Sequence, residues 1–170
     1  MNRWPTFFRC IAACMGAAIL YGIVHDMVTA HVCVEYFTLA HEKYIDSTSP
    51  VVVGLLFGVI STWWAGAALG ILVGYAAARG EKPPLPVREV VRMLTWMLCI
   101  LFSLAMLAGA VGYHVGGNVS DDDLIKFGIA DERIARFWFD VWAHLASYGG
   151  GLAGGVILAL VAYRKRAISA

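Results

Sequence analysis

Four long apolar stretches constrain this chain more than any other feature of its sequence. They cover residues 7–29, 51–78, 90–114 and 137–163. Each is long enough to cross the hydrocarbon core of a bilayer, which needs about 20 mostly apolar residues. The composition agrees, because 60% of the residues are hydrophobic and only 15% are charged. Backbone groups in lipid must be satisfied within their own segment, and the stretches lack the alternation of barrel strands, so the sequence predicts helices.

The predicted fold class is therefore all-α, an integral membrane bundle of four transmembrane helices that forms a single membrane domain over residues 1–170. Nine of the thirteen Lys and Arg residues lie in or directly beside the N-terminal tail, the second loop and the C-terminal tail. They are Arg3, Arg9, Arg79, Lys82, Arg88, Arg92, Arg164, Lys165 and Arg166. The cytoplasmic segments of membrane proteins carry an excess of Lys and Arg, so both termini are expected in the cytoplasm. The expected location is the bacterial inner (cytoplasmic) membrane, which the chain crosses several times.

The first apolar stretch is interpreted as an uncleaved anchor. Ile11-Ala12-Ala13-Cys14 resembles a lipoprotein cleavage box, but too few residues separate Arg9 from this cysteine to form an apolar signal region.

Two of the predicted helices carry glycines at spacings that permit close helix packing. In the second helix Gly54 and Gly58, and then Gly66, Gly70 and Gly74, recur every four residues. The last helix contains Gly149, Gly150, Gly151, Gly154 and Gly155. Small residues at such spacing let membrane helices approach each other closely. The expected partners are the lipid bilayer and another helix of this chain, a second copy or another membrane protein, whereas no nucleic-acid partner is expected.

All five histidines lie toward the predicted outer side of the membrane, and three of them fall at a similar depth. At a rise of about 1.5 Å per residue, His25 lies about 24 Å beyond Arg9. By the same measure His144 lies about 30 Å from Arg164, and His114 about 33 Å from Arg92. Three helices are thus expected to bring a histidine to the outer third or the outer boundary of the bilayer.

Carboxylates and hydroxyls accompany these histidines. Asp26 follows His25, Asp140 lies one turn before His144, and Thr29 and Tyr148 lie one turn after the two histidines. Glu35 and His41 are expected on a helical extension of the first span, because no helix breaker separates them from it. Ionisable groups at membrane depth usually face the bundle interior or a watery cavity and mark functional sites.

Three interpretations of this outer cluster remain open. The first is a metal site for zinc, copper or iron, because imidazole and carboxylate ligands suit these ions. Its candidate ligands are His25, Glu35, His41, His114 and His144. The second is a ligand pocket or proton relay, whose candidate residues are Asp26, Thr29, Asp140 and Tyr148. The third is structural, with histidines and acids pairing to hold helix ends together.

Two sequence motifs also resemble a known family. The run from His25-Asp26 through Thr29 to Glu35-Tyr36-Phe37-Thr38 and His41, together with 142–148, resembles the signature of an uncharacterised family of small bacterial four-helix membrane proteins. That family often has Gln, Arg and Pro where Met27, His31 and Glu42 stand here, which argues against a role for these three. The resemblance implies importance for His25, Asp26, Thr29, Glu35, His41 and His144, and it supplies no activity.

The sequence therefore favours a membrane protein with a His/carboxylate site that opens to the periplasm and binds a metal ion or a small ligand. Two alternatives belong to other classes. One is a membrane-embedded enzyme that uses the same site for hydrolysis or redox chemistry, and the other is a structural subunit that packs through its glycine faces.

Overall fold

The computed structural model describes residues 3–118 and 121–168 and is 82% helical, with no strand in the described part of the chain. The long helices are α1 (Trp4–Val32), α3 (Pro50–Ile60) with α4 (Trp63–Ala78), α5 (Val87–Gly116) and α7 (Ile134–Ile168). They form four segments long and apolar enough to cross a membrane. The all-α, four-helix prediction is confirmed, and each predicted span lies within one of these four segments.

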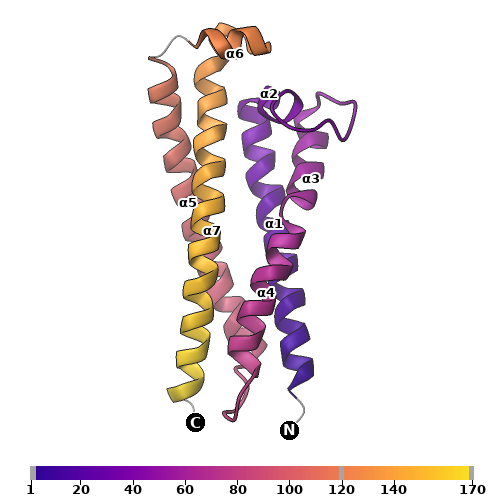
Figure 1. Ribbon diagram of the computed structural model, residues 1–170, viewed down its shortest axis with the longest axis vertical. Helices are drawn as coiled ribbons and strands as arrows, with labels where there is room; N and C mark the ends of the chain where they lie inside the picture. The colour runs from indigo at the N-terminus through magenta and orange to yellow at the C-terminus, as the bar shows by residue number, and fades with distance from the viewer. Residues whose placement is uncertain (1–2, 119–120, 169–170) are drawn as a thin grey trace.

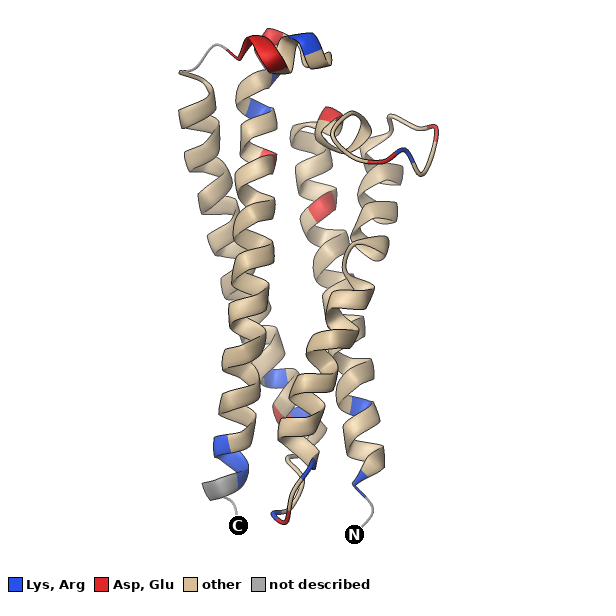
Figure 2. Cartoon of the chain, in the orientation of Figure 1, with Lys and Arg blue, Asp and Glu red and all other residues tan. Residues whose placement is uncertain are grey.

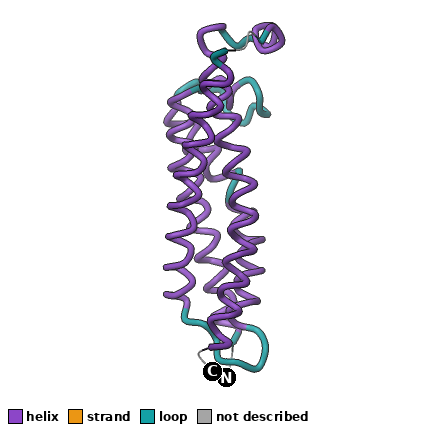
Figure 3. The backbone as a smooth tube through the Cα atoms, turned by 90° about the vertical axis from the view of Figure 1, so that its left-hand side faces the viewer, coloured by secondary structure: helices purple, strands orange, loops and turns teal. Residues whose placement is uncertain are grey.

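The second of these segments differs from the prediction because it is interrupted at its centre. Ser61 and Thr62 separate α3 from α4, and the break is visible inside the bundle in Figure 3. The Ser61 hydroxyl donates to the carbonyl of Phe57, and the Thr62 hydroxyl donates to that of Gly58 at 2.5 Å. Hydroxyls that bond to the carbonyl one turn back compete with the helix ladder and bend helices. Two adjacent residues of this kind account for the break.

The helices are arranged as two antiparallel hairpins that stand side by side (Figure 1). In one hairpin α1 packs against α3 and α4, and in the other α5 packs against α7. Contacts of α4 with α7 and of α1 with α5 join the hairpins. Both termini lie at the same end of the bundle, which is called here the terminal end, and the opposite end is called the far end.

The glycines of α3 and α4 face α1. A Cβ added at Gly58 would lie 2.5 Å from the Cα of Ile23, and one added at Gly70 would lie 2.8 Å from the Cα of Ile11. Gly54, Gly66 and Gly74 meet the α1 backbone at comparable distances. Backbone atoms cannot move aside as a flexible side chain can, so a larger residue at these positions would force the helices apart. This glycine face is therefore used within the chain.

The glycines of α7 behave differently. Gly150, Gly154 and Gly155 approach only side chains, those of Leu101, Met97 and Leu69. Gly149 has no heavy atom within 4 Å of an added Cβ, whereas Gly151 has ordinary contact with Leu101 at 3.7 Å. The close approach between α5 and α7 comes instead from Gly109, Gly112 and Gly116 of α5, which pack against Phe139, Trp138 and Trp142.

Short elements close the far end. The prediction that the first helix continues to Glu35 and His41 is wrong. Helix α1 ends at Val32, because Cys33 adopts an extended backbone with φ −148° and ψ 91°. The chain then turns into α2 (Val34–Thr38), which lies across the far end of the bundle (Figure 1). This turn buries Tyr36 and Phe37. Helix α6 (Asp122–Phe127) and the 3₁₀ turn η1 (Asp131–Arg133) precede α7.

Basic residues gather at the terminal end of the chain, and most acidic residues lie at the far end (Figure 2). One basic residue has a structural role that its position in a charged tail did not suggest. The guanidinium of Arg166 is buried, and it donates hydrogen bonds to the backbone carbonyls of Ala76, Arg79, Lys82 and Pro83 at 2.6–3.0 Å. Arg166 thus ties the end of α7 to the last turn of α4 and to the loop after it.

Candidate metal centre

Three of the predicted residues meet between α1 and α7. The Oδ1 atom of Asp26 lies 3.0 Å from Nδ1 of His25 and 3.4 Å from Nε2 of His144. One ligand atom from each residue lies within 4.8 Å of the other two, and all three residues are buried. We call this group the His–Asp–His cluster. It joins the two hairpins at the level where the sequence placed His25 and His144.

A backbone carbonyl fixes the orientation of His144. Its Nδ1 lies 2.7 Å from the carbonyl oxygen of Asp140, one turn earlier on α7. A carbonyl oxygen only accepts, so Nδ1 carries the proton, and Nε2 of a neutral His144 presents its lone pair to Asp26. Two acceptors that face each other at 3.4 Å need a proton or a metal cation between them. A carbonyl that orients the second ring nitrogen is also a common feature of metal-binding histidines.

Two buried groups, one in the cluster and one beside it, lack hydrogen-bond partners. Neither carboxyl oxygen of Asp140 has a hydrogen-bond partner, although the residue is 0% exposed. The Nε2 atom of His25 is likewise buried without a partner. A buried carboxyl group without hydrogen bonds is tolerated only as the neutral acid or beside a cation. Asp140 is therefore either the neutral acid or the neighbour of a positive charge in the cluster.

The candidates Thr29 and Tyr148 flank the cluster without bonding to it. The Thr29 hydroxyl donates to the carbonyl of His25 at 3.1 Å, so it serves the α1 backbone. The ring of Tyr148 lies 5.9 Å from that of His144. Sequence reasoning missed Ser147, whose buried hydroxyl is 2.8 Å from that of Tyr21. Its position three residues after His144, on the same helix face, is the signal that could have identified it.

Helix α2 covers the cluster toward the far end. The rings of Tyr36 and Phe37 lie 4.5 and 5.5 Å from that of His144. The candidate ligand His41 packs on this cover, because its Nδ1 donates to the carbonyl of Tyr36 at 2.9 Å and its ring lies 5.6 Å from that of Phe57. The sequence predicted a site open at this end, but the structure shows a site closed by aromatic rings.

Glu35, another candidate ligand, forms an ion pair instead. Its Oε2 accepts a hydrogen bond from Arg133 at 2.7 Å and one from the Cys33 thiol at 3.4 Å. Burial by itself would raise the pKa of Glu35, but these hydrogen bonds outweigh burial and hold the pKa below its ordinary value. Burial raises the pKa of the Cys33 thiol to about 12, so that it remains a donor. The pair connects α2 to η1.

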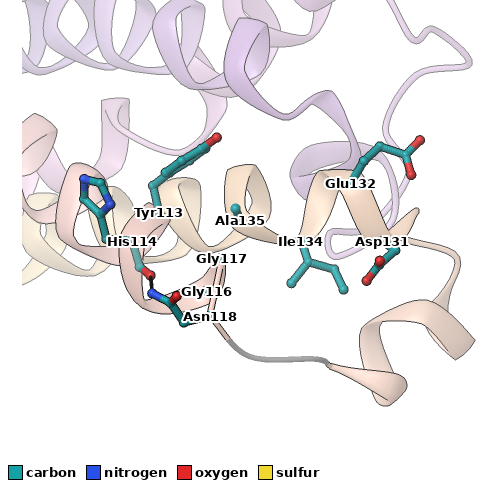
Figure 4. A pocket seen from close by; sticks show the side chains of 9 residues that line it. All are labelled: Tyr113, His114, Gly116, Gly117, Asn118, Asp131, Glu132, Ile134 and Ala135. Carbon is teal, nitrogen blue, oxygen red and sulfur yellow. Dashed lines mark hydrogen bonds between the residues drawn. The ribbon is translucent and has the colours of Figure 1, made fainter.

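His114 lies apart from the cluster. It is exposed in the last turn of α5 and lines a cavity of about 700 Å³ between the end of α5 and the start of α7. Asp131 and Glu132 line the same cavity, but their carboxylates and the imidazole lie at opposite ends of it (Figure 4). The structure therefore does not bring His114 together with an acidic partner.

The fold and the cluster together define a class: an all-helical protein with four helices long and apolar enough to cross a membrane, and a buried His–Asp–His cluster between the first and the last of them. Comparison of the chain with protein-family models, with curated proteins and with solved structures finds no match. The resemblance to small bacterial four-helix membrane proteins thus stays a prediction.

Proposed function

We propose that this protein resides in the bacterial inner membrane and binds one transition-metal ion at the His–Asp–His cluster. Both termini face the cytoplasm, and the far end faces the periplasm. The charge distribution supports this orientation, since nine of the thirteen basic residues belong to the terminal end (Figure 2). The cluster then lies in the periplasmic half of the membrane.

The observation that carries the proposal is the contact between Asp26 and His144. Two ligand atoms about 2.1 Å from a shared tetrahedral ion lie roughly 3.4 Å from each other. The Oδ1–Nε2 separation of 3.4 Å equals this spacing. The 3.0 Å separation between Asp26 and His25 needs only a slight widening. A divalent cation would also balance the charges of Asp26 and the unpartnered Asp140.

The ligand types narrow the choice of ion. Two imidazoles and a carboxylate suit zinc, copper or iron, whereas Ca²⁺ and Mg²⁺ prefer an oxygen-only shell. We take Zn²⁺ as the first ion to test, because three protein ligands with nitrogen and oxygen donors fit its tetrahedral geometry. Three protein ligands also leave a coordination position free, as in catalytic zinc sites. That count supports a membrane-embedded hydrolase as a second candidate function.

Metal binding can be measured on protein purified in detergent, stripped with a chelator and dialysed against Zn²⁺. We expect one ion per chain by elemental analysis, and loss of this ion in His25→Ala, His144→Ala and Asp26→Asn. His114→Ala and His31→Ala are matched controls, because both histidines are exposed and outside the cluster. Binding should weaken as the pH falls, since protonated imidazole cannot bind a metal.

Two outcomes would contradict the proposal. One is a native protein that retains neither zinc, copper nor iron at stoichiometric level. The other is a cluster variant that folds and keeps its ion. In either case a proton shared between Asp26 and His144 would satisfy the facing acceptors, and the cluster would only hold the hairpins together.

A further inference from the structure

A second internal feature lies between the two hairpins, on the terminal side of the cluster. It is a cavity of about 530 Å³ whose walls come from α1, α4, α5 and α7. Protein interiors are close-packed and rarely contain voids much larger than a water molecule. This volume instead falls within the range of small-molecule binding pockets, about 300–1,000 Å³.

The residues that line the cavity indicate the side from which a ligand would enter. They are largely apolar, with side chains such as Leu69, Met97 and Leu101, and no Lys, Arg, Asp or Glu lines the cavity among the described residues. Trp64 and Leu152 also line it, and they are 58% and 65% exposed on the outside of the bundle. In a chain that spans a membrane, such a rim faces lipid, so the occupant would enter from the bilayer.

One end of the cavity is polar. Tyr21, Ser147 and Tyr148 line it there, and the hydroxyls of Tyr21 and Ser147 lie 2.8 Å apart. The rings of Tyr21 and Tyr148 in turn lie 5.7 and 5.9 Å from those of His25 and His144. From this end the cavity follows α7 for about 16 Å, as far as Leu158, at the helical rise per residue. It has the shape of a site for a chain with a small head group.

The depth of the polar end decides the charge of that head group. Tyr21 lies twelve helical residues beyond Arg9, or about 18 Å into a hydrocarbon core of about 30 Å. A charged head group at this depth is costly without an opposite charge, and the lining residues offer none. The zwitterionic head of a phospholipid is therefore excluded from this end, whereas a hydroxyl or carbonyl group fits the hydroxyls of Tyr21, Ser147 and Tyr148. The other two hydroxyls that line the cavity, those of Ser61 and Thr62, donate to backbone carbonyls.

We propose that this cavity binds an uncharged lipophile from the bilayer, with a long hydrocarbon chain along α7 and a hydroxyl or carbonyl head group at Tyr21 and Ser147. The site is separate from the proposed metal centre and does not require an ion in it. Protein treated with a chelator should bind the lipophile as well as untreated protein does.

The test uses hexadecanol with a diazirine in its chain, photolysed with the full-length protein in nanodiscs. Labelling should saturate, and the labelled peptides should come from the cavity walls. Gly151 lines the cavity with room for a side chain, so Gly151→Leu should lower labelling about tenfold by occupying the space. Gly149→Leu is the matched control, because Gly149 lies two residues away on the same helix, outside the lining, and should label normally.

A second variant tests the head group without altering packing. Tyr21→Phe should weaken hexadecanol labelling about fivefold by removing one hydrogen-bonding hydroxyl. Labelling by the corresponding hexadecane probe, which has no head group, should stay unchanged. The proposal is overturned if Gly151→Leu labels like the native protein, if Tyr21→Phe has no effect on hexadecanol labelling, or if unlabelled hexadecanol does not compete with the probe.

Discussion

At the scale of single residues, the far end of this protein contains two kinds of charged contact. The His–Asp–His cluster is almost dry, and both Nε2 of His25 and the carboxyl group of the neighbouring Asp140 lack hydrogen-bond partners. The Glu35–Arg133 pair is partly solvated, with side chains 29% and 26% exposed, and the carboxylate accepts from both Arg133 and the Cys33 thiol, although Nε of Arg133 is buried without a partner. We interpret the dry cluster, whose ligand atoms lie close enough to share an ion, as the binding site, and the partly solvated ion pair as a structural contact.

The structural role of the Glu35–Arg133 pair predicts a pH-dependent effect on stability. The pKa of Glu35 is lower in the folded protein than its ordinary value of 4.5. Its contribution to stability is therefore fully present above pH 4.5 and is lost as the pH falls through the lowered pKa. Glu35→Gln should cost about 0.2–1 kcal/mol at pH 7, the range of exposed pairs. The difference in free energy of unfolding between Glu35→Gln and the native protein should vanish at a pH below the lowered pKa of Glu35.

Thermal unfolding in detergent over a pH series measures this difference. Asp46→Asn is the control, because the Asp46–Lys43 pair has an almost fully exposed carboxylate and should contribute nothing measurable. If Glu35→Gln lowers the melting temperature equally at pH 7 and at the lowest pH of the series, Glu35 acts by packing rather than by charge.

At the scale of helices, α1 and the broken pair α3–α4 are held by backbone contact at the glycine face. Gly→Ala substitutions test this directly. In an unobstructed helix, Ala is favoured over Gly by about 1 kcal/mol. At Gly70 the new Cβ would lie 2.8 Å from the α1 backbone, so Gly70→Ala should destabilise by about 1–3 kcal/mol through overpacking.

Gly16→Ala is the matched control, because an added Cβ there meets nothing within 4 Å. It should leave the melting temperature unchanged or raise it. The two substitutions are chemically identical, yet only Gly70→Ala is predicted to lower the melting temperature. Equal effects at Gly16 and Gly70 would mean that α4 does not approach α1 as closely as described.

At the scale of the whole molecule, orientation in the membrane decides which compartment the far end faces. Cysteines introduced at the exposed positions Thr48 and Glu81 lie at the far end and the terminal end respectively. In a Cys33→Ala background, Thr48→Cys should react with a membrane-impermeant thiol reagent in intact cells. Glu81→Cys should react only after lysis. The reverse pattern would place the cluster on the cytoplasmic side.

The sequence by itself determined the helices and the depth of their polar residues. Apolar length predicted four segments, and a fixed rise per residue predicted that His25 and His144 share a level. Spacing also predicted that the glycines of the second segment pack against a helix. These properties depend on local geometry along one helix axis, which sequence distance measures directly.

Only the tertiary structure decided which polar residues meet. His25, His114 and His144 have similar depths, yet only His25 and His144 share a carboxylate, because contact also depends on how each helix is rotated and on which helix lies beside it. The turn at Cys33 likewise has no breaker in the sequence. It is stabilised by burial of Tyr36 and Phe37 against residues of α3 and α7, which lie far away along the chain. Rotation, neighbours and such turns are set by packing between distant segments, and no local pattern encodes them.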